Sequence, residues 1–174
     1  MPPDPAIVTT FYLEMRAPAQ LRPARGRDAL AVRECEIPQF ELNRFLYRFV
    51  GAAWEWTDKL GWSDAQWRAW AEDPALRTWV AYHRGSPAGY FELHKQPGEA
   101  VEIAYFGLAP AFIGRGFGGE LLTRCIGCAW AWGASRVWVH TCSLDHPAAL
   151  ANYRARGMRL YHREIHPRKG IETP

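Results

Sequence analysis

Two spacings of apolar residues recur along this chain, and each predicts a different kind of element. From Ile7 to Met15 β-branched and aromatic residues dominate, which is typical of a strand. From Gln39 to Val50 large apolar residues recur at helical spacing. Ser63 stands where the N-cap of a second helix is expected, ahead of Trp67 and Trp70. The sequence before residue 78 therefore predicts one strand followed by two helices.

The second half of the chain predicts a denser alternation of strands and helices. Three apolar segments separated by turn residues predict an antiparallel meander at Thr78–His83, Ala88–His94 and Val101–Leu108. The later expected elements are a helix at Gly116–Trp132, a strand at Arg136–Cys142, a helix capped by Asp145 or His146 that ends just before Gly157, and a strand at Met158–Ile165.

This order predicts an α/β sandwich, with a mixed, mostly antiparallel sheet flanked by about four helices. We expect the final strand, helix and strand to form a right-handed crossover. The segment 18–27, rich in Pro and Gly, is expected to be a loop, and the tail from His166 onward is expected to fray. The length of 174 residues fits a single domain.

Composition and charge exclude several classes of function. The formal net charge is only +3, and the densest basic stretch, Arg22–Arg33, is short and interrupted, so a nucleic-acid partner is not expected. No apolar run is long enough for a membrane span, and residues 1–5 lack the basic and apolar parts of a leader. We therefore expect a cytoplasmic protein.

The four cysteines do not indicate a metal centre. Cys125 and Cys128 form a C-x-x-C pair, but no second pair of ligands stands nearby at metal-binding spacing. Both lie in an apolar helical pattern, where a free cysteine packs as a small hydrophobic residue. We expect no metal.

The Trp-rich stretch 54–70 is likewise expected to serve packing, mainly as the core between helices.

A glycine-rich loop, Ile113–Gly119, lies between an expected strand and an expected helix. Glycine allows positive φ and close approach of a ligand to the main chain. The first turn of a helix adds unpaired N–H groups and a partial positive charge, so the pattern predicts a phosphate or diphosphate site. A tight turn without a ligand is the alternative, but four glycines in residues 114–119 exceed what a turn requires.

The glycines at 114, 116 and 119 also satisfy the G-x-G-x-x-G pattern of dinucleotide-binding proteins. Three features disfavour that interpretation. Residues 109–112 separate the glycines from the strand, positions 134–138 lack the expected acidic residue, and about 55 residues are too few to complete the fold.

The loop instead resembles the acyl-coenzyme A loop of the GNAT acetyltransferases, whose pattern is Gln/Arg-x-x-Gly-x-Gly/Ala. Gly116-Phe117-Gly118 fits the end of this pattern, whereas Ile113 departs from its first position, and Arg115 offers a positive charge nearby. Residues 148–158 are similar to the family's Tyr-bearing helix and the start of the strand after it, with Met158 in place of Phe. The resemblance is specific from about residue 78 to residue 165.

The resemblance implies transfer of an acetyl group from acetyl-coenzyme A to an amine. It implies that Tyr153 is the acid for the leaving thiolate and that Glu102 is the base, with His140 and Glu92 as alternatives. It also implies that Phe106 and Leu108 offer main-chain groups to the pantetheine arm and that a gap between two strands admits this arm. The residues expected to bind the cofactor are Phe106, Leu108, Ile113, Gly114, Arg115, Gly116, Phe117, Gly118, Gly119 and Asn152.

The expected organisation is one N-acetyltransferase domain, with residues 1–77 on the acceptor side and residues 78–165 as the acyl-coenzyme A core. The expected partners are acetyl-coenzyme A and an amine, without nucleic acid or membrane, and a homodimer is left open. Two alternatives remain: a module that binds acyl-coenzyme A without turnover, and a nucleotide-binding oxidoreductase. The acceptor amine and the preferred acyl chain cannot be read from the sequence.

Overall fold

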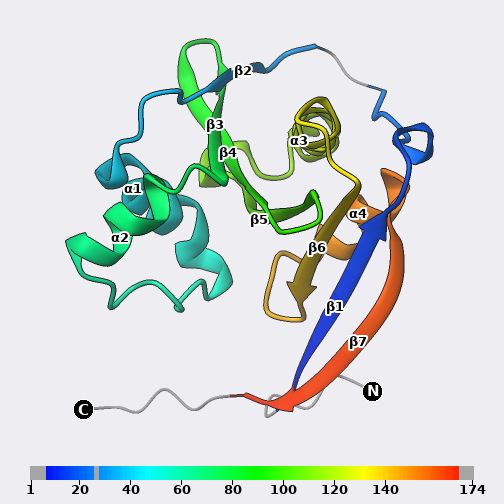
Figure 1. Ribbon diagram of the computed structural model, residues 1–174. Coiled ribbons are helices and arrows are strands. Elements are labelled where there is room, and N and C mark those ends of the chain that lie inside the picture. The colour runs from blue at the N-terminus through cyan, green and yellow to red at the C-terminus, as the bar shows by residue number, and fades with distance from the viewer. Residues whose placement is uncertain (1–6, 26–27, 169–174) are drawn as a thin grey trace.

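The computed structural model describes residues 7–25 and 28–168, which form a seven-stranded sheet with helices on both faces (Figure 1). The order of the strands across the sheet is β2-β3-β4-β5-β6-β1-β7. The strands are β1 (Ile7–Met15), β2 (Ala31–Glu34), β3 (Leu76–His83), β4 (Ser86–Lys95), β5 (Ala100–Leu108), β6 (Arg136–Cys142) and β7 (Arg159–Pro167). The helices are α1 (Phe40–Gly51), α2 (Asp64–Ala71), α3 (Phe117–Ala131) and α4 (Ala149–Ala155), with 3-10 turns η1 (Pro18–Gln20), η2 (Ala52–Trp54) and η3 (Pro110–Phe112).

The predicted cap of α2 is confirmed, and its geometry explains where the helix begins. The Ser63 hydroxyl accepts a hydrogen bond from the Gln66 main-chain N–H at 3.3 Å. In return, the Gln66 side-chain oxygen accepts from the Ser63 N–H at 2.9 Å. This reciprocal pair satisfies two donors that the first turn of a helix would otherwise leave unpaired.

The two faces of the sheet carry different helices because successive strand residues point to opposite sides. On one face, the α3 residues Leu121 and Ile126 share a core cluster with Phe91 of β4. On the other face, Val50 of α1 packs with Tyr90, the β4 neighbour of Phe91. Burial of both faces fixes the central strands between two helical layers.

The strand topology confirms the expected meander and adds a less obvious arrangement. Strands β3, β4 and β5 pair antiparallel in sequence order. Strand β1 lies between β6 and β7 and is antiparallel to both, so β6 and β7 run parallel without touching. The N-terminal strand β1 therefore joins the two C-terminal strands, β6 and β7, into one sheet.

Some expected boundaries were wrong. Strand β2 was not predicted, because its four residues lie at the sheet edge and only Val32 among them is partly buried. Neither Asp145 nor His146 caps α4, which has Ala148 as its N-cap. The last strand continues to Pro167 where fraying was expected from His166, while Gly26 and residues 169–174 lie outside the described residues.

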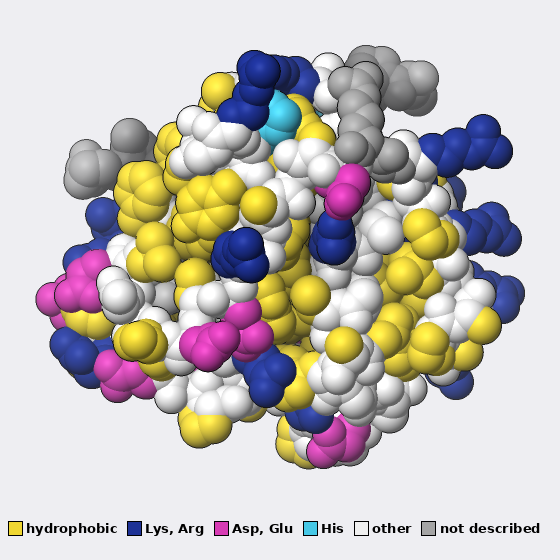
Figure 2. All heavy atoms as spheres, turned by 90° about the horizontal axis from the view of Figure 1, so that it is seen from above, with side chains coloured by type: hydrophobic (Ala, Val, Ile, Leu, Met, Phe, Trp, Pro, Cys, Tyr) yellow, Lys and Arg dark blue, Asp and Glu magenta, His cyan; other side chains and the backbone are white. Residues whose placement is uncertain are grey.

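The C-x-x-C pair packs as the sequence predicted. Cys125 is fully buried in the core cluster of α3, and Cys128 packs partly buried against the same cluster. Within residues 7–25 and 28–168, no helix is long and apolar enough to cross a membrane. On the face shown in Figure 2, Lys and Arg side chains are spread among apolar and acidic ones and do not gather into one patch.

Candidate active site

The parallel strands β5 and β6 separate soon after they meet. Only three residue pairs join them, of which the last is Glu102 with Trp138. Beyond that point, β6 continues as a partner of β1, whereas β5 stays with β4 (Figure 1). A bulge at Ala104 accompanies the separation, because Glu92 pairs with Tyr105 while Leu93 already pairs with Ile103. Bulges bend a strand and redirect its side chains.

Near its end, β5 directs main-chain groups toward the side on which β6 no longer pairs with it. The Ala109 N–H donates to the Ala88 carbonyl of β4 at 2.8 Å. Because main-chain groups alternate sides along an antiparallel strand, Phe106 and Leu108 direct theirs away from β4. The two residues predicted to meet the pantetheine arm therefore offer hydrogen-bonding groups that β6 does not use.

The glycine loop has the backbone conformation that its sequence predicted. Gly114 and Gly116 adopt positive φ, 75° and 85°, and Gly116 is the N-cap of α3. Within the described part of the chain, the N–H groups of Gly114, Arg115 and Gly116 donate to no acceptor at good geometry. A row of free N–H groups at the start of a 15-residue helix suits an anion.

The glycines at 118 and 119 serve the packing of α3 against α4. The Asn152 side-chain amide donates to the Gly118 carbonyl at 3.0 Å. A Cβ on Gly119 would lie 2.3 Å from Nη1 of Arg156, so a side chain there would have to displace the Arg156 guanidinium. Asn152, predicted to contact the cofactor, thus has a structural hydrogen bond through its amide nitrogen.

Tyr153 lies in α4 with its ring in the core and its hydroxyl unbonded. The residue is 6% exposed, and its ring centroid lies 6.1 Å from that of Phe106. Its hydroxyl has no hydrogen-bond partner among the described residues, yet it is not one of their fully enclosed unpaired atoms. Burial, with a smaller effect from Asp145, raises the pKa of Tyr153, so the hydroxyl keeps its proton at neutral pH.

Glu102 and His140, predicted as alternatives for the base, form a pair across the separating strands. Nδ1 of His140 lies 3.4 Å from Oε1 of Glu102, whose other oxygen accepts from Gln96 at 3.2 Å. The His140 side chain is 50% exposed and that of Glu102 only 15%, so the imidazole is the more accessible group. The hydrogen bond to Glu102 raises the pKa of His140, although burial opposes it.

Glu92, the other alternative base, is committed to the packing of α1 and α2. It is 1% exposed and accepts from the Asn43 amide and the Trp70 indole, both at 2.7 Å. Burial raises the pKa of Glu92 to about 7. These contacts give Glu92 a structural place away from Tyr153.

A scan against protein-family models matches residues 33–158 to the acetyltransferase (GNAT) family. The match covers well over half of the chain and includes the glycine loop, Glu102, His140 and Tyr153. The chain belongs to the GNAT family of acetyltransferases.

Curated relatives resemble parts of this GNAT chain. A mycothiol acetyltransferase of Nocardia farcinica is 34% identical over 103 residues, which are 59% of this chain and 32% of that protein. An uncharacterized N-acetyltransferase of Mycobacterium tuberculosis is 31% identical over 77 residues, which are 44% of this chain and 49% of that protein. The chain therefore spans about a third to a half of the length of these relatives.

Solved structures share the fold at low identity. A GCN5-related N-acetyltransferase from Sphaerobacter thermophilus superposes with a TM-score of 0.67 at 18% identity, covering 97% of this chain and 54% of that one. A second, from Kribbella flavida, gives a TM-score of 0.64 at 15% identity, covering 94% of this chain and 60% of that one. The mixed α/β sheet is thus the GNAT fold.

Arg156 is a charged residue beside the glycine loop of this GNAT chain, and sequence reasoning missed it. Its guanidinium lies against Gly119 in the first turn of α3, and its Nε is buried without a hydrogen-bond partner among residues 7–25 and 28–168. Predicted Arg115, in contrast, is exposed and reaches back to the Ala111 carbonyl at 3.5 Å. The signal in the sequence that could have indicated Arg156 is its position one helical turn after Asn152, a residue already expected to bind the cofactor.

The connection between α1 and α2 in this GNAT chain reaches across to the C-terminal half, which sequence reasoning also missed. The Trp54 ring lies 4.8 Å from that of His146, and Glu55 forms an ion pair with Arg168. Trp67, by contrast, is 1% exposed, as its helical spacing predicted. The connection therefore contacts the segment between β6 and α4 through Trp54 and the residue after β7 through Glu55.

Proposed function

We propose that this chain is an N-acetyltransferase that moves an acetyl group from acetyl-coenzyme A to a primary amine by direct attack in a ternary complex. The observation that carries the proposal is the separation of β5 from β6 beyond Glu102, with the free N–H groups of the glycine loop and the Tyr153 hydroxyl nearby in the same fold. The organisation of residues 1–77 as the acceptor side and 78–165 as the acyl-coenzyme A core belongs to the same proposal.

The residues present fit the diphosphate of coenzyme A. Free N–H groups from Gly114 to Gly116 and the dipole of α3 favour a multiply charged anion. Ile113 cannot supply the side-chain contact that its position carries in the family. The unpaired Nε of Arg156 marks a guanidinium held beside the same turn, which compensates for that loss of positive charge.

The main chain of β5 holds and polarises the acyl group in this proposal. Acetyl-coenzyme A supplies an activated acetyl group as a thioester. Phe106 and Leu108 direct main-chain groups to the side where that thioester would lie. A fixed N–H donor at the carbonyl oxygen stabilises the negative charge that develops there.

The pair of Glu102 and His140 removes the proton from the amine. His140 is the exposed member, and Glu102 orients the imidazole through Nδ1, which leaves Nε2 to accept a proton. As the N–C bond forms and the C–S bond breaks, Tyr153 donates its proton to the sulfur. The Tyr153 hydroxyl is protonated at neutral pH and therefore has a proton to give, and the tyrosinate left after the transfer regains a proton from solvent.

The test is a titration with acetyl-coenzyme A followed by a screen for thiol release with polyamines, aminoglycosides, amino acids and peptide N-termini. We expect saturable binding and release of free thiol with at least one amine class. Absence of binding at millimolar concentrations would contradict the proposal. Binding without thiol release across the whole panel would instead favour a sensor of acyl-coenzyme A.

A further inference from the structure

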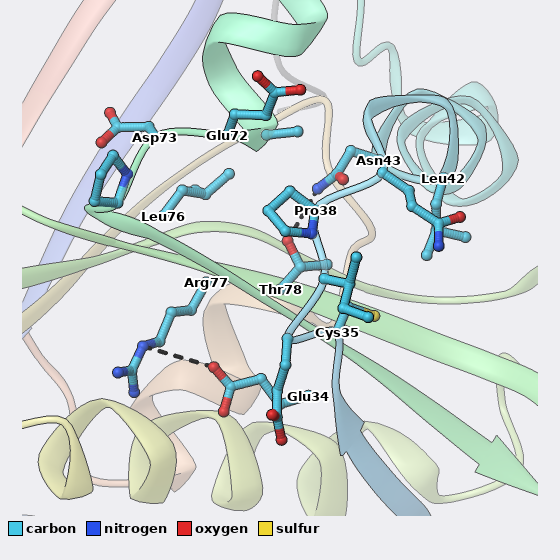
Figure 3. Close-up of a pocket in the computed structure, with 15 residues that line it drawn as sticks. Glu34, Cys35, Pro38, Leu42, Asn43, Glu72, Asp73, Leu76, Arg77 and Thr78 are labelled. Atoms are coloured by element: carbon cyan, nitrogen blue, oxygen red, sulfur yellow. Dashed lines mark hydrogen bonds and ion pairs between the residues drawn. The ribbon is translucent and has the colours of Figure 1, made fainter.

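A cavity of about 420 Å³ lies between α1, the end of α2 and the start of β3 (Figure 3). Its volume falls in the range of roughly 300–1,000 Å³ that is usual for small-molecule sites. It shares no residue with the glycine loop, Tyr153, Glu102 or His140. None of the residues given a chemical role in acyl transfer lines this cavity, although most of the lining belongs to the segment 1–77.

Two buried polar residues in the cavity lining keep unused hydrogen-bonding capacity. Asn43 is 4% exposed and Thr78 is 7% exposed. The Asn43 amide nitrogen donates to the Thr78 hydroxyl at 2.9 Å and to Glu92 at 2.7 Å. Within the described residues, Oδ1 of Asn43 accepts no hydrogen bond and is not fully enclosed. A ligand with an N–H or O–H donor would satisfy this oxygen.

The lining carries an excess of negative charge. Its ionisable groups are the carboxylates of Glu34, Glu36, Glu72 and Asp73 and the guanidinium of Arg77. Arg77 lies 3.6 Å from Glu34 and balances it. From outside the lining, Arg68 pairs with Glu72, and Nε2 of His94 lies 3.5 Å from Asp73. Glu36 has no ion-pair partner in the described part of the chain. The cavity therefore favours a cation over a neutral or anionic molecule.

Apolar side chains complete the walls. Pro38, Leu42 and Leu76 are apolar residues of the lining, and the close-up view shows Pro38 and Leu42 on either side of Asn43 (Figure 3). Such walls contact a hydrocarbon or aromatic body but offer nothing to a fully hydrated metal ion. Size, charge and polarity thus point to an organic cation.

We propose that this cavity is a binding site for a small organic ammonium ion with an apolar body, separate from the acyl-transfer site. Its N–H donates to Oδ1 of Asn43, its apolar part lies against Pro38, Leu42 and Leu76, and the surrounding carboxylates balance its charge. The site does not depend on catalysis, because its residues are distinct from those assigned to acyl transfer.

The test is calorimetric titration of the full chain with benzylamine and, as the uncharged counterpart, benzyl alcohol. We expect benzylamine to bind at least about tenfold more tightly. Removal of two cavity charges in Glu36→Gln/Glu72→Gln should weaken benzylamine binding about fivefold, because each exposed charge contributes below about 1 kcal/mol. Glu41→Gln, an exposed change on α1 outside the lining, should leave affinity unchanged.

A second comparison separates this cavity from the acceptor site. Benzylamine binding should persist in Glu102→Gln and fall in Asn43→Ser, whose folding is checked by thermal unfolding. Equal affinity for the amine and the alcohol would overturn the proposal. The proposal would also be overturned if Glu102→Gln lost its affinity for benzylamine while the Glu36→Gln/Glu72→Gln variant kept it. Neither outcome would bear on acetyl-coenzyme A binding at the glycine loop.

Discussion

At the scale of single residues, the proposed chemistry depends on one pair of side chains and one hydroxyl. Glu102 and His140 come from two strands whose pairing has just ended, and their side chains meet at 3.4 Å. Tyr153 reaches the core from α4 and keeps its hydroxyl free. Their different environments are the basis for the different roles proposed for them, because the imidazole of a histidine can accept a proton while the hydroxyl of a buried tyrosine retains its own.

The pH dependence of turnover tests the role of His140. A base must be unprotonated, so kcat/KM should rise with pH through the pKa of His140, which Glu102 raises above 6.5. Glu102→Gln should move this limb of the profile to lower pH, and His140→Asn should remove it with about a 100-fold loss of kcat/KM. His162→Asn, which alters an exposed histidine on β7, is the control. If the rise of kcat/KM occurs at the same pH in Glu102→Gln as in the wild type, Glu102 does not influence the base.

The substitution Tyr153→Phe tests whether Tyr153 is the acid that protonates the leaving sulfur. Phenylalanine keeps the packed ring and removes only the hydroxyl, so affinity for coenzyme A should stay within about twofold while kcat falls about 100-fold. The comparison requires steady-state kinetics together with a binding titration. Tyr82→Phe on β3, far from α4, should change neither quantity. Wild-type kcat in Tyr153→Phe would remove Tyr153 from the mechanism.

At the scale of elements, the start of α3 and the end of β5 create the site together. The loop before α3 supplies free N–H groups only because Gly114 and Gly116 adopt positive φ. The bulge at Ala104 and the departure of β6 supply free groups along β5. Each feature has its own physical cause, and the fold places them at the same end of the sheet.

Substitution of two glycines with similar backbone conformation distinguishes a loss of cofactor binding from the effect of backbone strain. Gly116 and Gly85 have φ of 85° and 83°, and a Cβ on either would meet no atom within 4 Å. Gly116→Val and Gly85→Val should therefore lower the free energy of unfolding by similar amounts, about 1–2 kcal/mol. Only Gly116→Val should abolish coenzyme A binding, measured by titration. Wild-type affinity in that variant would place the phosphates elsewhere.

At the scale of the whole molecule, a buried carboxyl links stability to pH. Glu92 joins α1 and α2 to the sheet through Asn43 and Trp70, and burial raises its pKa to about 7 from 4.5. Between these two pH values the folded protein binds more protons at Glu92 than the unfolded chain does. The free energy of unfolding should therefore fall as pH rises through this window.

Glu92→Gln should remove this dependence. The wild type should lose up to about 3 kcal/mol from Glu92 between about pH 5 and pH 7, and the variant should lack that slope, although loss of one hydrogen bond lowers its stability at every pH. Denaturant unfolding at several pH values measures the difference. Glu41→Gln on the exposed side of α1 should keep the wild-type slope. Parallel curves for wild type and Glu92→Gln would contradict the assignment.

Local patterns predicted much of the fold and part of the site. The cap at Ser63, the meander, the helix after Gly116 and the strand Arg136–Cys142 were confirmed, because each depends on nearby residues. Strand β2 and the start of α4 were missed. A four-residue edge strand has no clear alternation, and Asp145 bonds back to Thr141 and Cys142 rather than to a helix.

The sequence by itself determined most of the elements and the conformation of the glycine loop, since backbone freedom and apolar spacing are local properties. Only the tertiary structure decided which distant residues meet. It placed β1 between β6 and β7, joined Glu102 to His140, and set Arg156 against Gly119. Such contacts depend on strand order and helix packing across the sheet, which no spacing along one segment specifies.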